Sequence, residues 1–156
     1  MSNRIKIKIC GVNDFESMKT VCNLLVDYIG FVFFEHSPRN ITIKYAKNLL
    51  KINNNKCNIV ALTVNANDNL LKKIVTSIKP NFIQLHGNEN PSRCFEIKKK
   101  FNVKIIKALE VKNTRLLNHN INLYKGVVDI FLLDSPKSNL PGGNGKKFNW
   151  KLIKKK

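Results

Sequence analysis

The chain has 156 residues, 43% of them hydrophobic, and carries a formal net charge of +18 at pH 7. A chain of this length and composition can bury one hydrophobic core and is too rich in apolar residues to remain disordered. No apolar run approaches membrane-spanning length and the alternation of charge and isoleucine after Arg4 is unlike a signal peptide, so we expect one cytoplasmic domain over residues 1–156.

Short β-rich runs alternate with amphipathic helical segments along the whole chain. The predicted strands cover residues 5–10, 28–34, 57–64, 81–86, 103–109 and 127–134. A helix is predicted after each strand, and the last one starts at residue 148. Asn13, Thr42 and Asn67 are predicted to cap three of these helices, and Pro91 suits the first position of a fourth.

Six consecutive pairs of a strand and a helix predict a parallel sheet, because apolar strands buried on both faces need crossover helices. A doubly wound sheet usually carries several glycines in its first turn, but the turn after Cys10 has only one. In a (β/α)₈ TIM barrel, functional groups follow the carboxyl ends of several strands, and Cys10, His86 and Asp134 have such positions. We therefore predict an α/β fold of the TIM-barrel type.

Residue parity places the polar strand ends on common faces, because alternate residues of a strand face opposite sides. Lys8 and Cys10 share one face of the first strand, while its isoleucines share the other, where helices would cover them. Gln84 lies on the same face as His86 in the fourth strand, and Asp134 ends the sixth. These faces can all point into one barrel lumen, although an exposed edge strand would explain Lys8 equally well.

The excess of positive charge is the feature in which this composition differs most from that of an ordinary globular protein, with 28 Lys and Arg against 10 Asp and Glu. The lysines are spread from Lys6 to Lys156, and no basic stretch is interleaved with aromatic residues on which bases would stack. The joint abundance of Asn, Lys and Ile favours a coding bias toward A and T. We therefore expect no nucleic-acid partner and no membrane partner, while the charge could still attract an anionic substrate.

The four cysteines show neither a disulfide framework nor a metal motif. Cys10, Cys22, Cys57 and Cys94 lie in apolar surroundings, without a Cys-x-x-Cys pair and without histidines at zinc-binding spacing. A reduced cytoplasmic protein without a metal site is the expectation. Cys22, Cys57 and Cys94 are expected to act as small buried hydrophobic residues.

Six short motifs occur in register with the six predicted strands. They are Lys8-Ile9-Cys10-Gly11, Ser37-Pro38-Arg39, Val64-Asn65, Gln84-Leu85-His86-Gly87, Ile106-Lys107-Ala108 and Leu133-Asp134-Ser135. Each is weak alone, but in this order they resemble the phosphoribosylanthranilate isomerase family of tryptophan biosynthesis, as far as about Trp150. The resemblance implies a TIM-barrel enzyme that acts on a phosphorylated small molecule without a metal or cofactor.

The resemblance implies an Amadori rearrangement of N-(5-phosphoribosyl)anthranilate to 1-(2-carboxyphenylamino)-1-deoxyribulose 5-phosphate. An acid protonates the ring oxygen of the sugar, and a base then removes the proton from C2. By resemblance Asp134 is the acid and Cys10 is the base. Apolar residues 130–133 would bury the carboxyl and disfavour its charged form. A cation such as Lys8 would favour the thiolate that a cysteine base requires.

Two further groups would bind the substrate by the same resemblance. Arg39 would hold the anthranilate carboxylate with its planar guanidinium, and Gly142, Gly143 and Gly145 would form a mobile lid. A plain flexible turn explains the three glycines nearly as well. His86 is predicted to be a structural residue of the lumen rather than a catalyst.

An eight-stranded barrel would continue past Lys156, so we expect a barrel that is truncated after about six βα units. By resemblance, the substrate phosphate binds to loops after the seventh and eighth strands. The lysines at 154–156 are where a shift of the reading frame is expected. Three functions stay open at this point: an isomerase, an inactive truncated relic of that enzyme, and a basic nucleic-acid-binding module on the same scaffold.

Overall fold

The structure is a computed structural model, and it describes residues 4–24, 26–53, 57–136, 147 and 149–153. Strands and helices alternate in this part of the chain. The strands are β1 (Lys8–Cys10), β2 (Tyr28–Phe33), β3 (Asn58–Thr63), β4 (Phe82–Leu85), β5 (Lys104–Glu110) and β6 (Ile130–Asp134). The helices are α1 (Phe15–Asn23), α2 (Ile43–Asn53), α3 (Asp68–Ile78), α4 (Pro91–Phe101), α5 (Thr114–Tyr124) and the 3-10 turn η1 (Trp150–Leu152).

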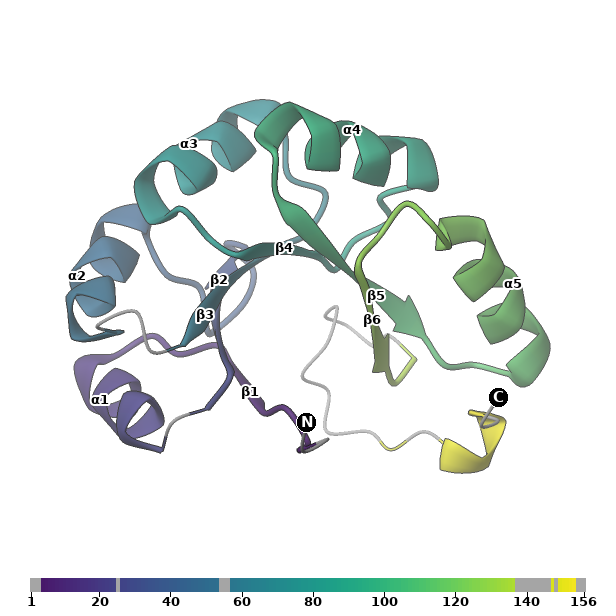
Figure 1. Cartoon of the computed structure of the whole chain (residues 1–156), viewed down its shortest axis with the longest axis horizontal. Helices are drawn as coiled ribbons and strands as arrows, with labels where there is room; N and C mark the ends of the chain where they lie inside the picture. The colour runs from purple at the N-terminus through teal and green to yellow at the C-terminus, as the bar shows by residue number, and fades with distance from the viewer. Residues whose placement is uncertain (1–3, 25, 54–56, 137–146, 148, 154–156) are drawn as a thin grey trace.

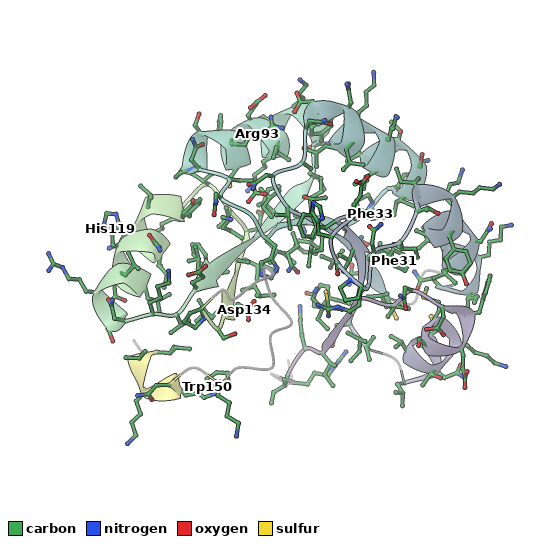
Figure 2. The ribbon with its side chains drawn as sticks, turned by 180° about the vertical axis from the view of Figure 1, so that it is seen from behind. Phe31, Phe33, Arg93, His119, Asp134 and Trp150 are labelled. Atoms are coloured by element: carbon green, nitrogen blue, oxygen red, sulfur yellow. The ribbon has the colours of Figure 1, made fainter. Side chains whose placement is uncertain are left out.

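All neighbouring strands pair in parallel, and their spatial order is the chain order from β1 to β6. Figure 1 shows that the sheet curves into an arc, with α1 to α5 on its convex side. The side chain of His119 on α5 points away from the sheet (Figure 2). A doubly wound sheet would reverse its strand order and carry helices on both faces, so the barrel prediction is confirmed.

Local sequence signals start most of the helices where they were expected. Thr42 and Asn67 each accept the backbone N–H of the residue three positions on, and Pro91 lies in the first turn of α4. The prediction for α1 was wrong by one residue. Asp14, and not Asn13, caps this helix, because its carboxylate accepts a backbone N–H at 2.7 Å.

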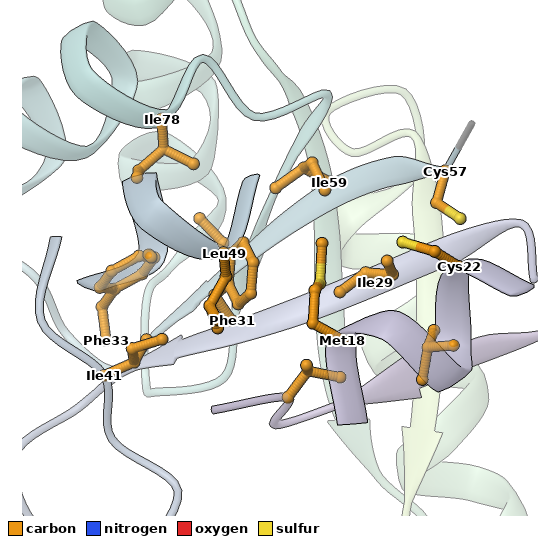
Figure 3. Close-up of a cluster of buried hydrophobic side chains, with 14 of the residues drawn as sticks. Met18, Cys22, Ile29, Phe31, Phe33, Ile41, Leu49, Cys57, Ile59 and Ile78 are labelled. Atoms are coloured by element: carbon orange, nitrogen blue, oxygen red, sulfur yellow. The ribbon is translucent and has the colours of Figure 1, made fainter. Parts of the chain in front are cut away.

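The main core fills the space between the convex face of the sheet and its helices. Under α1 to α3 it contains fully buried side chains from helix and strand alike, among them Met18, Ile29, Phe31 and Leu49 (Figure 3). A second cluster under α4 and α5 is built in the same way. Burying a side chain of this size contributes about 1.5–3 kcal/mol, so these layers fix the positions of the strand ends.

The first strand is shorter and more exposed than the sequence predicted. Ile5, Ile7 and Ile9 are 86%, 50% and 40% exposed, so the prediction that helices cover them was wrong. β1 has a strand neighbour on one side only within the described residues, and α1 packs toward α2. An edge strand without a covering helix leaves its outer face in water.

The concave face carries a small apolar layer and, above it, the polar strand ends. Val60, Phe82 and Ile106 form a buried cluster there, with Tyr28 and Leu132 packed against it. Parallel register places the next inward-facing residues of each strand one level higher, toward the carboxyl ends. The candidate site lies at that level.

Candidate active site

A cavity of about 150 Å³ lies on the concave side of the sheet, at the carboxyl ends of its strands. Its polar side chains are Lys8, Cys10, Ser37, Arg39, Gln84, His86 and Asp134. The structure therefore brings together Cys10 from β1, Arg39 from the loop after β2 and Asp134 from β6. Figure 2 shows Asp134 inside the arc of the sheet.

Gly30 on β2 makes room for the polar side chains of the first strand. A Cβ atom at this position would lie 3.0 Å from Cys10 Sγ and 3.2 Å from Lys8 Nζ. The thiol and the ammonium group therefore both project over the backbone of Gly30, which pairs with Cys10 in the sheet.

Arg39 reaches the same place from the loop after β2. Gly11 has a φ of +85°, and a Cβ atom there would lie 2.5 Å from Arg39 Cδ. The arginine side chain thus lies against the glycine that follows Cys10. Ser37 Oγ accepts the backbone N–H of Arg39 at 3.2 Å and orders the loop. Two motifs that are far apart in sequence become neighbours in this way.

Hydrogen bonds hold Asp134 at the end of β6. Its Oδ1 accepts the backbone N–H of Ser135 at 2.8 Å, and its Oδ2 lies 3.1 Å from His86 Nε2. The expectation that residues 130–133 bury this carboxyl was wrong. The Asp134 side chain is 27% exposed and Ile130 is 36% exposed, because β6 is an edge of the described sheet.

The structure also places Gln84 and His86 in this cavity; the sequence analysis predicted His86 to be a structural residue of the lumen and gave Gln84 no role. Gln84 Nε2 lies 3.0 Å from His86 Nδ1, which links the amide to Asp134 through the imidazole ring. The shared parity of Gln84 and His86 in β4 was the available signal. It could not identify the partner, which lies on β6.

A buried ion pair braces the loop that begins at His86. Lys107 Nζ donates to Glu89 Oε2 at 3.0 Å and to the carbonyl of Gly87 at 2.8 Å, and both charged side chains are 3% exposed. Glu89 Oε1 accepts the backbone N–H of Asn65 at 2.7 Å. Because both charged side chains are buried, loss of one charge would leave the other uncompensated. Three of the sequence motifs meet in this network.

The other cysteines have no place in the cavity. Cys22, Cys57 and Cys94 are buried among apolar side chains, as predicted, whereas Cys10 is partly exposed. Burial raises the pKa of the Cys94 thiol to about 11, so this group stays protonated near neutral pH. Cys10 is thus the one cysteine of the four with access to a substrate.

Part of the predicted site lies outside the described residues. Gly142, Gly143 and Gly145 belong to the stretch 137–146, which the structure does not describe, so the proposed lid remains a prediction. A second cavity, of about 380 Å³, shares His86 and Asp134 and extends between the ends of β5 and β6 and α5.

Among the residues that the structure describes, no group of three His, Cys, Asp or Glu side chains could hold a metal ion. None of the helices described has the length and apolar character needed to cross a membrane.

Comparisons with known proteins identify the family. The family model for N-(5'phosphoribosyl)anthranilate (PRA) isomerase matches residues 7–156. The N-(5'-phosphoribosyl)anthranilate isomerase of Sinorhizobium medicae is 39% identical over 153 residues, which are 96% of this chain and 71% of that protein. The isomerase of Chelativorans is 37% identical over 96% of this chain and 70% of that protein.

Solved structures agree with this result. Phosphoribosyl anthranilate isomerase from Thermotoga maritima superposes with a TM-score of 0.81 at 28% identity, over 96% of this chain and 70% of that chain. A phosphoribosyl anthranilate isomerase in complex with reduced 1-(o-carboxyphenylamino)-1-deoxyribulose 5-phosphate has a TM-score of 0.73 at 27% identity, over 85% of this chain and 66% of that chain. The resemblance seen in the six sequence motifs is confirmed.

Proposed function

The chain belongs to the N-(5'-phosphoribosyl)anthranilate isomerase family, and we propose that it carries out this isomerisation in tryptophan biosynthesis with Asp134 as acid and Cys10 as base. The observation that carries the proposal is the cavity that both side chains line. It opens at the carboxyl ends of the strands, where TIM barrels hold their reacting groups. A related isomerase binds a carboxyphenylamino derivative of deoxyribulose 5-phosphate.

In the first step, Asp134 donates a proton to the ring oxygen of the ribosyl group. The bond between C1 and this oxygen breaks, its electron pair stays on the oxygen, and the nitrogen lone pair forms an iminium. Asp134 is half-buried and is held by two hydrogen bonds, so its carboxyl group has a defined direction in the cavity. Such positioning is a large part of the effect of a general acid.

In the second step, the Cys10 thiolate removes the proton from C2. The electrons of the C–H bond form the double bond of an enolamine, which neutralises the iminium and then tautomerises to the ketone. Lys8 Nζ and Cys10 Sγ both project over Gly30, so an ammonium group lies beside the proposed base. The step consumes no cofactor, because the oxidation of C2 and the reduction of C1 occur within one molecule.

Arg39 is the proposed partner of the substrate carboxylate. Its guanidinium offers two parallel N–H donors, a geometry that matches a carboxylate better than an ammonium group does. The contact with Gly11 directs this side chain to the edge of the cavity next to Cys10. We propose that the three glycines Gly142, Gly143 and Gly145 close over the bound substrate.

The decay of substrate fluorescence during turnover tests the proposal. Cys10→Ala and Asp134→Asn are each expected to lower kcat at least about 100-fold, because each removes a proton-transfer group. Cys22→Ala, at a buried thiol outside the cavity, is the matched control and should keep the activity. Wild-type turnover that neither variant reduces would contradict the roles proposed for these groups. A wild-type chain without turnover would contradict the function and favour the inactive relic.

A further inference from the structure

Gln84 and His86 form a hydrogen-bonded row that ends at Asp134, the proposed acid. Gln84 Nε2 lies 3.0 Å from His86 Nδ1, and His86 Nε2 lies 3.1 Å from Asp134 Oδ2. Gln84 is 1% exposed and His86 is 8% exposed. A neutral imidazole carries one hydrogen. When the amide nitrogen donates to Nδ1, the ring hydrogen lies on Nε2 and faces Asp134.

Resting on the function proposed above, we infer that Gln84 and His86 are positioning residues for Asp134. The Gln84 amide selects the imidazole tautomer, and the resulting Nε2–H fixes the carboxyl group in the cavity that it shares with Cys10. Without this row, the hydrogen bond from the backbone N–H of Ser135 would be left to hold a side chain that is 27% exposed on an edge strand. Groups that lock a reacting side chain are needed where positions must hold within about 0.5 Å.

The Gln84 side chain is enclosed by neighbouring strands, which restricts the movement of its amide group. Its strand register places it between Leu62 of β3 and Ile106 of β5, and its side chain is buried. Gln84 Oε1 has no hydrogen-bond partner among the residues that the structure describes. If the Gln84 amide turned over, its Oε1 would accept a hydrogen bond from His86 Nδ1–H. The neutral ring would then have no hydrogen on His86 Nε2, the atom that faces Asp134. One amide orientation therefore determines on which side the imidazole donates.

Charged side chains line both cavities around His86 and Asp134. The smaller cavity presents Lys8, Cys10 and Arg39 to His86 and Asp134, and the larger cavity presents Lys107, Glu110 and Lys112. Lys107 is paired with Glu89, and Lys112 with Glu110. The Asp134 carboxyl contacts the ring itself, with Oδ2 3.1 Å from Nε2. The hydrogen on Nε2 is the one that the neutral ring can share with Asp134.

Nitrogen-15 NMR of the histidine rings in the full chain tests this assignment without substrate. The chain has three histidines, and His86→Gln identifies the signal of this ring. We expect the wild-type ring to carry its hydrogen on Nε2 and none on Nδ1 at neutral pH. His119→Gln on the exposed face of α5 is the control and should leave that signal unchanged. A wild-type ring with its hydrogen on Nδ1 would overturn the inference.

Two substitutions of Gln84 separate positioning from simple packing. Gln84→Glu offers Nδ1 only acceptor oxygens, so the ring hydrogen is expected to appear on Nδ1. Gln84→Met keeps the side-chain volume without hydrogen bonding and is expected to give a mixture of tautomers. In this variant kcat should fall about 10- to 100-fold, with KM within about twofold, because the acid is misplaced while substrate contacts remain.

The kinetic outcomes distinguish the inference from the function on which it rests. If Cys10→Ala and Asp134→Asn abolish turnover while Gln84→Met keeps the wild-type kcat and the Nε2–H signal, the function stands and the inference fails. If Cys10→Ala and Asp134→Asn leave turnover intact, the proposed function fails, and the inference fails with it. A fall in kcat that accompanies the loss of the Nε2–H signal supports the positioning role.

Discussion

The interior strands of the sheet differ sharply from its two outer strands. In β2 to β5 most residues are buried, and β4 is buried throughout, whereas no residue of β1 or β6 is fully buried. Yet β1 carries Cys10 and β6 carries Asp134. The strands with two neighbours supply the stability, and the strands with one described neighbour supply the proposed chemistry. The positions of Cys10 and Asp134 therefore depend on the packing of the buried strands β2 to β5, which contain neither residue.

The largest effect on stability is expected inside the interior group. Phe31 of β2 is fully buried under α2. Phe31→Ala is expected to lower the free energy of unfolding by about 4 kcal/mol, because it removes buried apolar surface and leaves a cavity. Urea denaturation followed by circular dichroism measures the change. Ile9→Ala on β1 is the matched control, with an expected loss below about 1 kcal/mol; equal losses would remove the distinction between the two groups of strands.

The next largest effect is expected where the interior supports the loop of His86. Lys107→Met leaves Glu89 buried without its cation and should lower the free energy of unfolding by about 3 kcal/mol. The double variant Lys107→Met/Glu89→Gln removes the unpaired charge and should recover part of this loss. The same denaturation experiment compares the two. A double variant no more stable than the single one would show that unpaired charge is not the cause.

A smaller effect is expected at Gly30, where an interior strand meets the first strand. Gly30→Ala places a Cβ atom 3.0 Å from Cys10 Sγ, so the thiol must shift by a few tenths of an ångström. We expect turnover to fall about tenfold and the free energy of unfolding to change by at most about 1 kcal/mol. Steady-state kinetics and denaturation of the same sample test this. Unchanged turnover would show that the close approach over Gly30 has no role in the reaction.

The smallest effect is expected at the segment before β1. The backbone N–H of Ile7 and the guanidinium of Arg4 hold the pKa of Asp27 below its ordinary value of 3.8. A lowered pKa means that this carboxylate stabilises the folded chain above pH 3.8 and loses the contribution as the pH falls through the folded pKa. The NMR shift of the Ile7 amide should therefore titrate with a midpoint below 3.8. Asp27→Asn should abolish the titration, and a midpoint above 3.8 would contradict the prediction.

Local sequence patterns predicted the helices and strands. Predictions failed where a residue's burial or partner depends on a segment far away in the sequence. The caps at Thr42 and Asn67 were correct because a cap is a contact over three residues. Two expectations were wrong, that helices cover the isoleucines before Cys10 and that residues 130–133 bury the Asp134 carboxyl, because burial depends on what lies across the sheet. The link from His86 to Asp134 was missed for the same reason, since it joins β4 to β6.

The sequence by itself determined the alternation of strands and helices, the barrel type and the family, because periodicity and short motifs are properties of neighbouring residues. Only the tertiary structure decided that Cys10, Arg39 and Asp134 line one cavity and that Gln84 and His86 stand behind the acid. Sheet curvature and strand register set these distances. Both result from the packing of the buried strands β2 to β5 against their helices, which no single segment of the chain specifies.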